Sequence, residues 1–428
     1  MHSIYRVKQA LFTATAFLAL LLSACSLVPT PTITSTPTVA QATSSSTDVP
    51  VVTPEPVEEL IIWVAPAFAP GEDTEAGRLL AERLEQFTNN HPNVELSIRT
   101  KALQGDAGLL NTFLAANLAA PETLPDLITL NQNALATASG EGLLLPVVEW
   151  GDAPDAEEWY DFAITGSRIN GTFFGMPLAA EADIFAFWSA RFEQAPANWE
   201  LLLEENERFC LPLGDPRGTF TFASYSLMGG PSIEADGSLT LDSGILTSIL
   251  SFYQAAQEAQ LLAPESSTIE TTEECWDLLA IDQVSAAVVP LENVLHQVGS
   301  SLSGGSIPLQ HGPGFSLAST WSLALTTARP ERIELAAELA EWLSDPAFLG
   351  LWSEALGYLP ARAAALSTWE DEQQLALASS LVTLAMVQPS STILSPFSAA
   401  ITTAIDDVLD RGLPPASAAT DAAQGVLE

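Results

Sequence analysis

The sequence predicts an α/β fold in which a parallel sheet carries helices on both faces. Three apolar runs of strand length begin at residues 60, 94 and 126. These starts are 34 and 32 residues apart, which is the length of a strand–helix–strand unit. At 428 residues the chain is also too long for one ordinary hydrophobic core, so two lobes or domains are expected.

The segments between these starts have the periodicities that the fold requires. The first strand, Leu60–Val64, is a continuous apolar run. The helix after it has an apolar stripe at helical spacing, made of Ala76, Leu80, Leu84 and Phe87. Val94–Ile98 alternates apolar and polar residues as a strand, a second helical run covers Leu109–Leu118, and Asp126–Leu130 is the third strand. In such a sheet, ligand groups lie in loops at the carboxyl ends of the strands.

The stretch Gly171–Phe187 places two acids in an otherwise apolar strand. Glu181 and Asp183 are the only charged residues between Leu178 and Phe187. Residues two apart in an extended chain project to the same side, so both carboxylates face one direction. Burying a charge without a partner is costly, so this pair requires an explanation.

The N-terminus has the order of a secretory signal peptide. Arg6 and Lys8 precede an apolar run that ends at the tetrapeptide Leu22–Cys25. This tetrapeptide resembles the bacterial lipobox, which implies a signal peptide over residues 1–24 and lipidation of Cys25. The alternative is an uncleaved transmembrane anchor, but the run is about half the length of a membrane span. Residues 25–58 are rich in Pro, Thr and Ser, which predicts a disordered tether.

Charge and cysteine content limit the partners. The formal net charge is -39, so nucleic acid and anionic lipid surfaces would repel the folded part. Without Arg6 and Lys8, twelve scattered basic residues remain, which makes a strongly anionic ligand less favourable.

With Cys25 lipidated, two of the three cysteines remain. In an oxidising compartment Cys210 and Cys275 can form a disulfide, and the alternative is two separate buried thiols.

Several segments resemble, in the family's own order, landmarks of the extracellular solute-binding proteins of ABC importers (family 1, the maltose-binding-protein class). The segments are Leu60–Trp63, His91–Ile98, Leu124–Leu130, Gly142–Val147, Pro177–Ala182, Asn198–Leu202, Val284–Val289 and Gly357–Arg362. The resemblance covers roughly residues 59–428. It implies a two-lobed periplasmic-binding-protein-like fold of class II, with parallel-rich central sheets flanked by helices and several crossovers between the lobes.

The same resemblance implies the domain limits and the function. Lobe I would comprise residues 59–180 and 312–359, and lobe II residues 181–311 and 360–428. The protein would be a membrane-anchored lipoprotein on the extracellular or periplasmic side of the cell envelope. It would capture a neutral solute, a sugar or oligosaccharide, by hinge closure and deliver it to ABC permease subunits, without enzymatic activity or cofactor. A sensor of the same fold that has lost transport is an alternative.

Nine side chains are candidates for ligand contact. Those carried over by matching position are Glu181, Asn133, Asn293 and Phe397; those placed at element ends or in the acid pair are Phe68, Trp321, Tyr225, Glu292 and Asp183. Sugar sites combine flat apolar faces with carboxylates or amides, which suits these types. Leu130 and Asn293 stand where the family has stacking aromatics, which argues against maltodextrin. Each candidate has a structural alternative: a hinge hydrogen bond for Glu181, and core packing for aromatics such as Trp63, Phe185 and Phe187.

Enzymatic alternatives have weaker support. Glu181 and Asp183 could be the acid and base of an envelope glycoside hydrolase, since residues two apart on a strand are about 6 to 7 Å apart. Catalytic pairs, however, usually come from separate elements. Gly314–Ala318 resembles a nucleophile elbow only faintly, and no histidine follows His311 to complete the triad in that order. The four histidines show no metal-binding spacing, and there is no phosphate-binding loop of the GxxxxGK[ST] type.

Overall fold

The computed structural model describes residues 58–233, 238–297 and 301–426. These residues belong to one compact unit of the chain, Glu55–Glu428. The expected signal peptide, the lipidation site Cys25 and the expected tether up to residue 57 lie outside the described residues.

Ten strands of the described chain form one mixed sheet in which seven follow the order β2-β1-β3-β10-β6-β8-β7. Those seven are β1 (Glu58–Val64), β2 (Val94–Thr100), β3 (Leu127–Asn131), β6 (Met176–Trp188), β7 (Phe209–Cys210), β8 (Ala286–Pro290) and β10 (Ser316–Leu325). Three short strands pair at the sides, namely β9 (Leu302–Gly305), β11 (Leu359–Pro360) and β12 (Ala385–Val387). A separate hairpin consists of β4 (Arg168–Ile169) and β5 (Thr172–Phe173).

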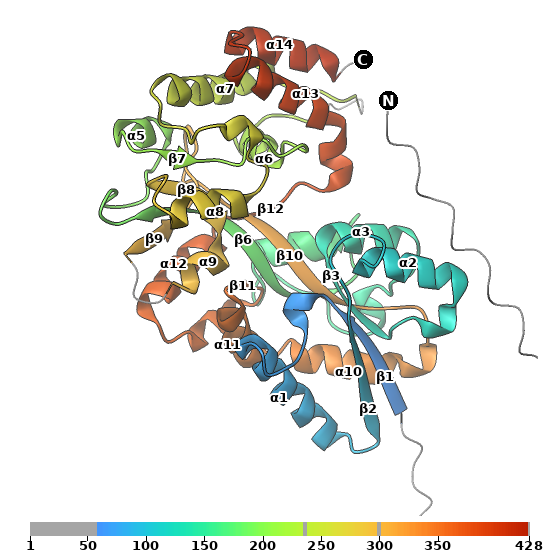
Figure 1. The fold of residues 1–428 in the computed structure, drawn as a ribbon. Coiled ribbons are helices and arrows are strands. Elements are labelled where there is room, and N and C mark those ends of the chain that lie inside the picture. Colours follow the sequence, from blue (N-terminus) through green and yellow to red (C-terminus); the bar gives the residue numbers. More distant parts are fainter. Residues whose placement is uncertain (1–57, 234–237, 298–300, 427–428) are drawn as a thin grey trace, which may run out of the picture. The chain divides into compact units, whose positions relative to one another are not determined.

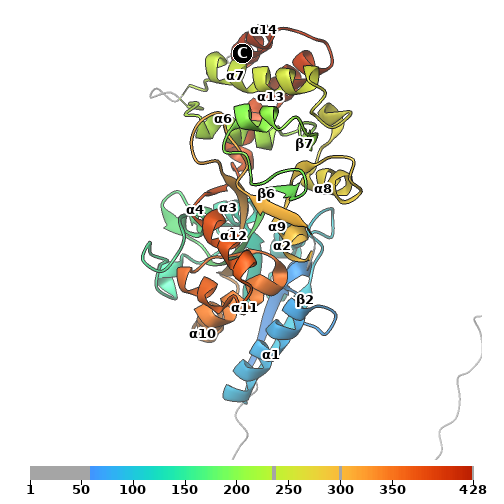
Figure 2. The same ribbon diagram turned by 90° about the vertical axis from the view of Figure 1, so that its left-hand side faces the viewer.

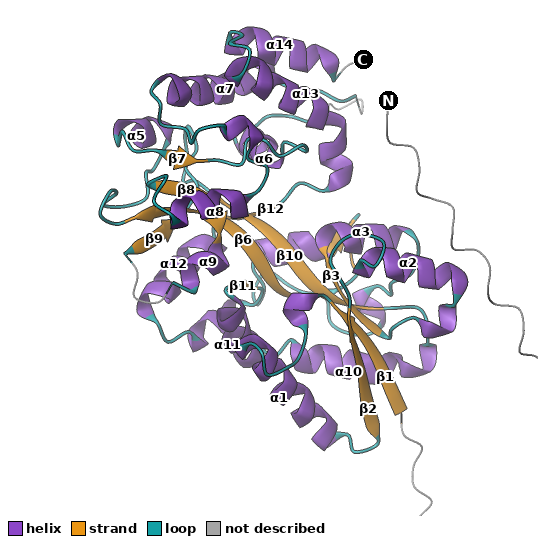
Figure 3. Cartoon of the chain, in the orientation of Figure 1, coloured by secondary structure: helices purple, strands orange, loops and turns teal. Residues whose placement is uncertain are grey.

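The parallel arrangement expected from the strand spacing is confirmed for the first three strands. β1 lies between β2 and β3 and is parallel to both. The sheet then changes direction, because β10 is antiparallel to both β3 and β6, and β6 is antiparallel to β8. The sheet is therefore mixed, with a parallel part at each end and two long antiparallel strands between them (Figure 3).

Three clusters of buried apolar residues stabilise this sheet. The N-terminal core draws its residues from 60–144, 178–179 and 321–365, and the C-terminal core from 185–262, 286–317 and 394–422. The central core draws its residues from 147–186, 210–295, 318 and 359–382. Strand β6 contributes to all three cores: Leu178 to the N-terminal core, Phe185 to the C-terminal core and Ile184 to the central core. β6 and β10 thus connect the parts of the molecule, as Figure 1 shows.

The helices can be grouped by the core they cover. Those of the N-terminal core are α1 (Glu75–Asn90), α2 (Leu109–Ala119), α3 (Gln132–Gly140), α10 (Ile333–Leu343) and α11 (Pro346–Leu356). Those of the C-terminal core are α5 (Trp199–Glu204), α6 (Thr219–Leu227), α7 (Ser243–Glu258), α13 (Ser391–Leu409) and α14 (Pro415–Gly425). Those of the central core are α4 (Asp161–Ser167), α8 (Thr272–Ala280), α9 (Leu291–Leu295) and α12 (Glu372–Val382). α7, α13 and α14 pack against one another (Figure 2).

Local sequence signals explain where several helices begin. The Thr74 side chain accepts a hydrogen bond from the Gly77 backbone N–H at the start of α1, and Asn198 caps α5 in the same way. The core alternative for Trp63, Phe185 and Phe187 is confirmed, because all three side chains are buried.

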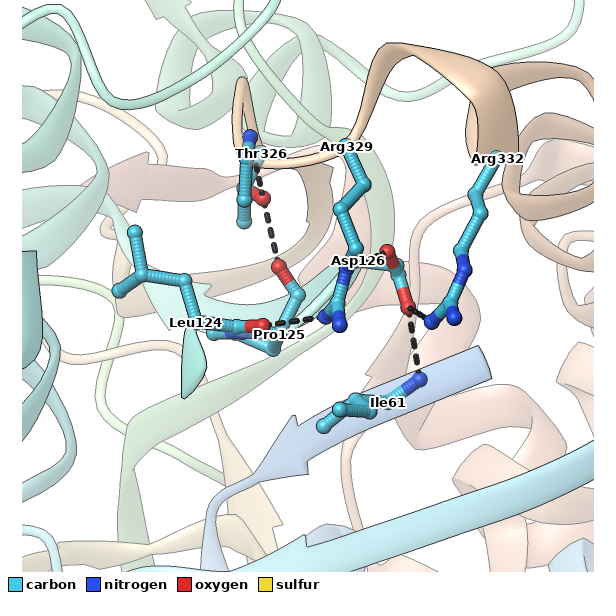
Figure 4. A network of polar contacts seen from close by, with 8 residues as sticks. Ile61, Leu124, Pro125, Asp126, Thr326, Arg329 and Arg332 are labelled. Carbon is cyan, nitrogen blue, oxygen red and sulfur yellow. Dashed lines mark hydrogen bonds and ion pairs between the residues drawn. The ribbon is translucent and has the colours of Figure 1, made fainter. Parts of the chain in front are cut away.

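A buried ion cluster connects β3 to the segment that follows β10 (Figure 4). Asp126 accepts hydrogen bonds from the Ile61 backbone N–H at 2.7 Å and from Arg329 Nε at 2.8 Å, and it contacts Arg332 Nη1 at 3.3 Å. Arg329 also donates to the Leu124 carbonyl oxygen. The carboxylate is almost fully buried, so its partners offset the cost of removing its charge from water.

The predicted disulfide is present. Cys210 in β7 and Cys275 in α8 are bonded, with a Cα–Cα distance of 5.5 Å. The bond closes a loop of 65 residues and ties α8 to the sheet.

Candidate functional site

Glu181 lies at a gap along one edge of β6. On one edge β10 pairs with β6 from Met176 to Asp183, with a register shift at Leu178, which has no partner residue. On the other edge β11 pairs only at 179 and 180, and β8 begins to pair only at Asp183. The backbone of residues 181 and 182 therefore has no strand beside it on that edge, and a cavity opens there.

The cavity has a volume of about 60 Å³. Its lining residues are Glu181, Ala182, Asp183, Glu273, Pro290, Leu291, Glu292, Leu317, Ser319, Gly357, Tyr358 and Gln388. Four of these described residues are acidic and none is Arg, Lys or His. Carboxylate oxygens accept hydrogen bonds only, so the cavity is suited to a solute that offers O–H or N–H donors and carries no negative charge.

Glu181 is held through one of its two oxygens. Trp321 Nε1–H and the Tyr358 hydroxyl both donate to Glu181 Oε1, each at 2.9 Å. Burial raises the pKa of the Glu181 carboxyl above its ordinary value, and the two donors act in the opposite direction because they stabilise the charged form. The sequence left open whether Glu181 binds ligand or makes a hinge hydrogen bond. In the structure it accepts two side-chain hydrogen bonds and also lines the cavity.

A group of buried aromatic rings supports these two donors. Phe68 packs edge-on against Trp321, with ring centroids 5.0 Å apart, and lies 6.3 Å from the Tyr358 ring. The Trp352 ring lies 5.3 Å from Phe68. Neither Phe68 nor Trp321, both predicted to contact the ligand, lines the cavity: Trp321 donates to Glu181, and Phe68 packs against the rings of both donors.

Asp183 is the second acid of the pair and is bound from α8. The Thr272 hydroxyl donates to Asp183 Oδ1 at 2.9 Å. Burial raises the pKa of Asp183 to about 7; the Thr272 bond opposes the rise, and the neighbouring carboxylates Glu273, Glu181 and Glu292 add to it. At neutral pH the Asp183 carboxyl group is therefore partly protonated.

Glu292 faces the same cavity from the first turn of α9. Burial and the negative charge of Glu181 raise its pKa, and His296 acts in the opposite direction. The end of α11 lies against this turn. Gly357 has a left-handed φ of 75°, and a Cβ at this position would lie only 2.7 Å from the Glu292 Cα. Glycine is required there both by its conformation and by the lack of space.

The other four predicted contacts lie away from the cavity. Asn133 Oδ1 accepts from the Ser391 backbone N–H at 3.0 Å and so connects α3 to the start of α13. Asn293 is half-buried in α9 and does not line the cavity. Tyr225 and Phe397 are fully buried in the C-terminal core. The Tyr225 hydroxyl donates to the Pro231 carbonyl oxygen, and Phe397 packs against Phe222 at 5.2 Å, so both are core residues rather than cavity residues here.

Sequence reasoning missed Tyr358, Glu273, Ser319 and Gln388. Tyr358 stands within the landmark Gly357–Arg362, where the glycine indicates the end of a helix but does not indicate what the buried tyrosine contacts. Glu273 had a weaker signal, as one of several acids in the first turn of a capped helix. Ser319 lies opposite Glu181 on β10, a pairing that only the strand register reveals.

The described residues contain no group of His, Cys, Asp and Glu arranged to hold a metal ion. None of the helices in the described ranges is both long and apolar enough to cross a membrane.

Comparison with known proteins identifies the family. Residues 82–376 match the family described as bacterial extracellular solute-binding protein. The chain belongs to this family. Its members bind solutes outside the cytoplasm and are not enzymes, in agreement with the resemblance seen in the sequence. Comparison with curated proteins finds no match.

Solved structures of similar proteins confirm the two-lobed periplasmic-binding-protein fold. The sugar-binding protein MalE from Xanthomonas citri is 17% identical with a TM-score of 0.69, over 86% of this chain and 96% of that one. Maltose-bound MalE3 from T. maritima is 16% identical with a TM-score of 0.66, over 86% and 98% of the chains. MalE from Listeria monocytogenes in complex with maltose is 12% identical with a TM-score of 0.67, over 87% and 97%.

Proposed function

We propose that this solute-binding protein is the lipid-anchored receptor of an ABC importer and captures a sugar or oligosaccharide. The observation that carries the proposal is the carboxylate-lined cavity at the strands that connect the cores. Its four acids offer acceptors for the hydroxyl groups of a sugar, and the absence of bases among the described lining residues disfavours anionic solutes. The similar structures named with maltose support the sugar class.

Capture would proceed by closure of two lobes. Lobe I comprises residues 59–180 and 312–359, and lobe II residues 181–311 and 360–428. A cavity of about 60 Å³ is much smaller than the roughly 300 to 1,000 Å³ of ordinary ligand pockets, so a sugar enters only when the lobes separate further. Contacts from both lobes then favour the closed state by their differential affinity.

The lipobox-like Leu22–Cys25 is the basis for the anchor. Lipid on Cys25 would hold the protein at the envelope, and the residues between Cys25 and the start of β1 at Glu58 would give the folded part reach toward permease subunits. A sensor that binds the same solute without transport is the second candidate. Radiolabelled sugar uptake in cells that lack the chain distinguishes the two, because uptake falls only if the protein serves a permease.

Sugar binding can be tested by thermal unfolding of the full chain with a panel of neutral, amino and acidic sugars. A neutral sugar at about 100 times its Kd stabilises the native state by about 2.7 kcal/mol and raises the Tm by a few degrees. Glu181→Gln should remove most of that shift, whereas Glu193→Gln, at an exposed site, should leave it unchanged. A shift seen only with acidic sugars, or release of a hydrolysed product, would refute the proposal.

A further inference from the structure

Both hydrogen-bond donors of Glu181 converge on the same carboxylate oxygen. Trp321 Nε1 and the Tyr358 hydroxyl each lie 2.9 Å from Oε1. A carboxylate oxygen has two lone pairs, so two donors satisfy it. Among the described residues, no hydrogen bond reaches Oε2, and the side chain lines the cavity. Oε2 is therefore the oxygen that is free to accept from a solute.

The two donors approach from opposite edges of β6. Trp321 belongs to β10, where it pairs with Ala179. Tyr358 immediately precedes β11, which pairs with residues 179 and 180 on the other edge. Each donor is fixed by its own strand, so the Glu181 side chain is held from both sides.

The rings that carry the donors have little freedom to move. Trp321 and Tyr358 are buried, and both contact the Phe68 ring. Rings packed in this way keep their rotamers, so the two donor groups are already oriented before a solute arrives. Holding an acceptor in place in advance lowers the ordering cost of binding.

We propose that Trp321 and Tyr358 are positioning residues of the solute site: together they fix Glu181 through Oε1 and direct Oε2 to a donor group of the solute. The inference rests on the proposed function, because it assigns these residues to the same site. It predicts that a solute carries an O–H or N–H group at the place that Oε2 faces. A purely structural role would instead mean that the two bonds only satisfy buried polar groups.

The test begins with the solute-free full chain, so it does not depend on knowing the sugar. Glutamate labelled with ¹³C at the side-chain carboxyl is incorporated, and the Glu181 resonance is identified by its loss in Glu181→Gln. Its pKa is then measured in wild type, Tyr358→Phe and Trp321→Phe. Each variant removes one donor to the charged form, and each should raise the Glu181 pKa by about one pH unit.

Trp352→Phe is the matched control. Trp352 is as buried as Trp321 and packs on the same Phe68 ring, but its Nε1 has no hydrogen-bond partner among the described residues and so donates no hydrogen bond to Glu181. This variant changes the aromatic group by the same reduction in ring size. It should leave the Glu181 pKa unchanged.

The second measurement is affinity for the sugar that gives the largest Tm shift in the wild-type panel. Tyr358→Phe should weaken binding about tenfold at pH 7. Affinity should also fall as the pH is lowered, and the midpoint of this fall should lie at a higher pH in the variant than in wild type. An unchanged Glu181 pKa in both donor variants overturns the inference, as does a raised pKa with unchanged affinity. If wild type binds no sugar, the proposed function fails, and the pKa measurement still decides whether the donors control Glu181.

Discussion

Replacing Asp183 by Asn should make the protein more stable at alkaline pH. Asp183 lies on β6, lines the cavity and accepts one side-chain hydrogen bond, from Thr272. An Asn side chain keeps an acceptor oxygen for that bond and removes the charge. The groups that face Asp183 are Glu181 on the same strand, Glu273 on α8 and Glu292 on α9, so no described positive charge in direct contact stabilises its ionised form.

The magnitude follows from the pKa of Asp183, which is raised from 3.8 to about 7 in the native state. In the unfolded chain the group loses its proton near pH 4, whereas in the native state it keeps the proton up to about pH 7. Native stability therefore falls as the pH rises from 4 to 7 and is constant above that. Each pH unit corresponds to about 1.4 kcal/mol, so the ionised carboxylate costs roughly 4 kcal/mol of native stability at pH 8.

Urea unfolding followed by tryptophan fluorescence measures this effect. The free energy of unfolding of Asp183→Asn should equal that of wild type at pH 4 and exceed it by roughly 4 kcal/mol at pH 8. Asp152→Asn, at an exposed loop, controls for the general change in net charge. Equal stability of wild type and Asp183→Asn at both pH values would refute the reasoning, because it would mean that the buried carboxylate is not destabilised.

Three further outcomes are expected. Replacing Cys210 and Cys275 by Ser should lower the free energy of unfolding by about 4 kcal/mol, as expected for a cross-link closing 65 residues, and a reducing agent should make wild type match the variant. Arg329→Leu should lower the free energy of unfolding in urea by about 3 kcal/mol, because Asp126 loses the closer of its two arginine partners. Arg332→Leu should lower it less. Because the net charge is -39, the acidic groups repel one another, and salt should weaken this repulsion. The Tm measured by calorimetry should therefore rise between 0.05 and 1 M NaCl, roughly the range in which the screening length falls below 10 Å. An unchanged Tm would contradict strong repulsion among these charges.

The sequence was most informative where one periodicity determines one element. Leu60–Val64 and Val94–Ile98 were predicted as strands and form β1 and β2, each with two more residues at one end. Their spacing also predicted the parallel pairing. The antiparallel position of β10 had no local signal, because it depends on where a strand far along the chain returns to the sheet.

The candidate site shows the same limit. Glu181 and Asp183 could be found because two charges interrupt an apolar strand. Tyr358 could not be assigned by residue type, since an isolated tyrosine after a glycine fits a core position as well as a cavity. Phe397 matches the position of a stacking aromatic ring in the family, but it lies on the face of α13 that is buried in the C-terminal core. Which face of a helix is buried depends on tertiary contacts, which a local match does not reveal.

The contact between Gly357 and Glu292 limits which sequences this site tolerates. A methyl group on Gly357 would overlap with Glu292 in the first turn of α9, so the end of α11 and that turn would have to move apart. Alanine at this position would still allow α11 to form, but the two helix ends could no longer meet. Such a change would displace Glu292, one of the four acids of the cavity, without replacing any of the four.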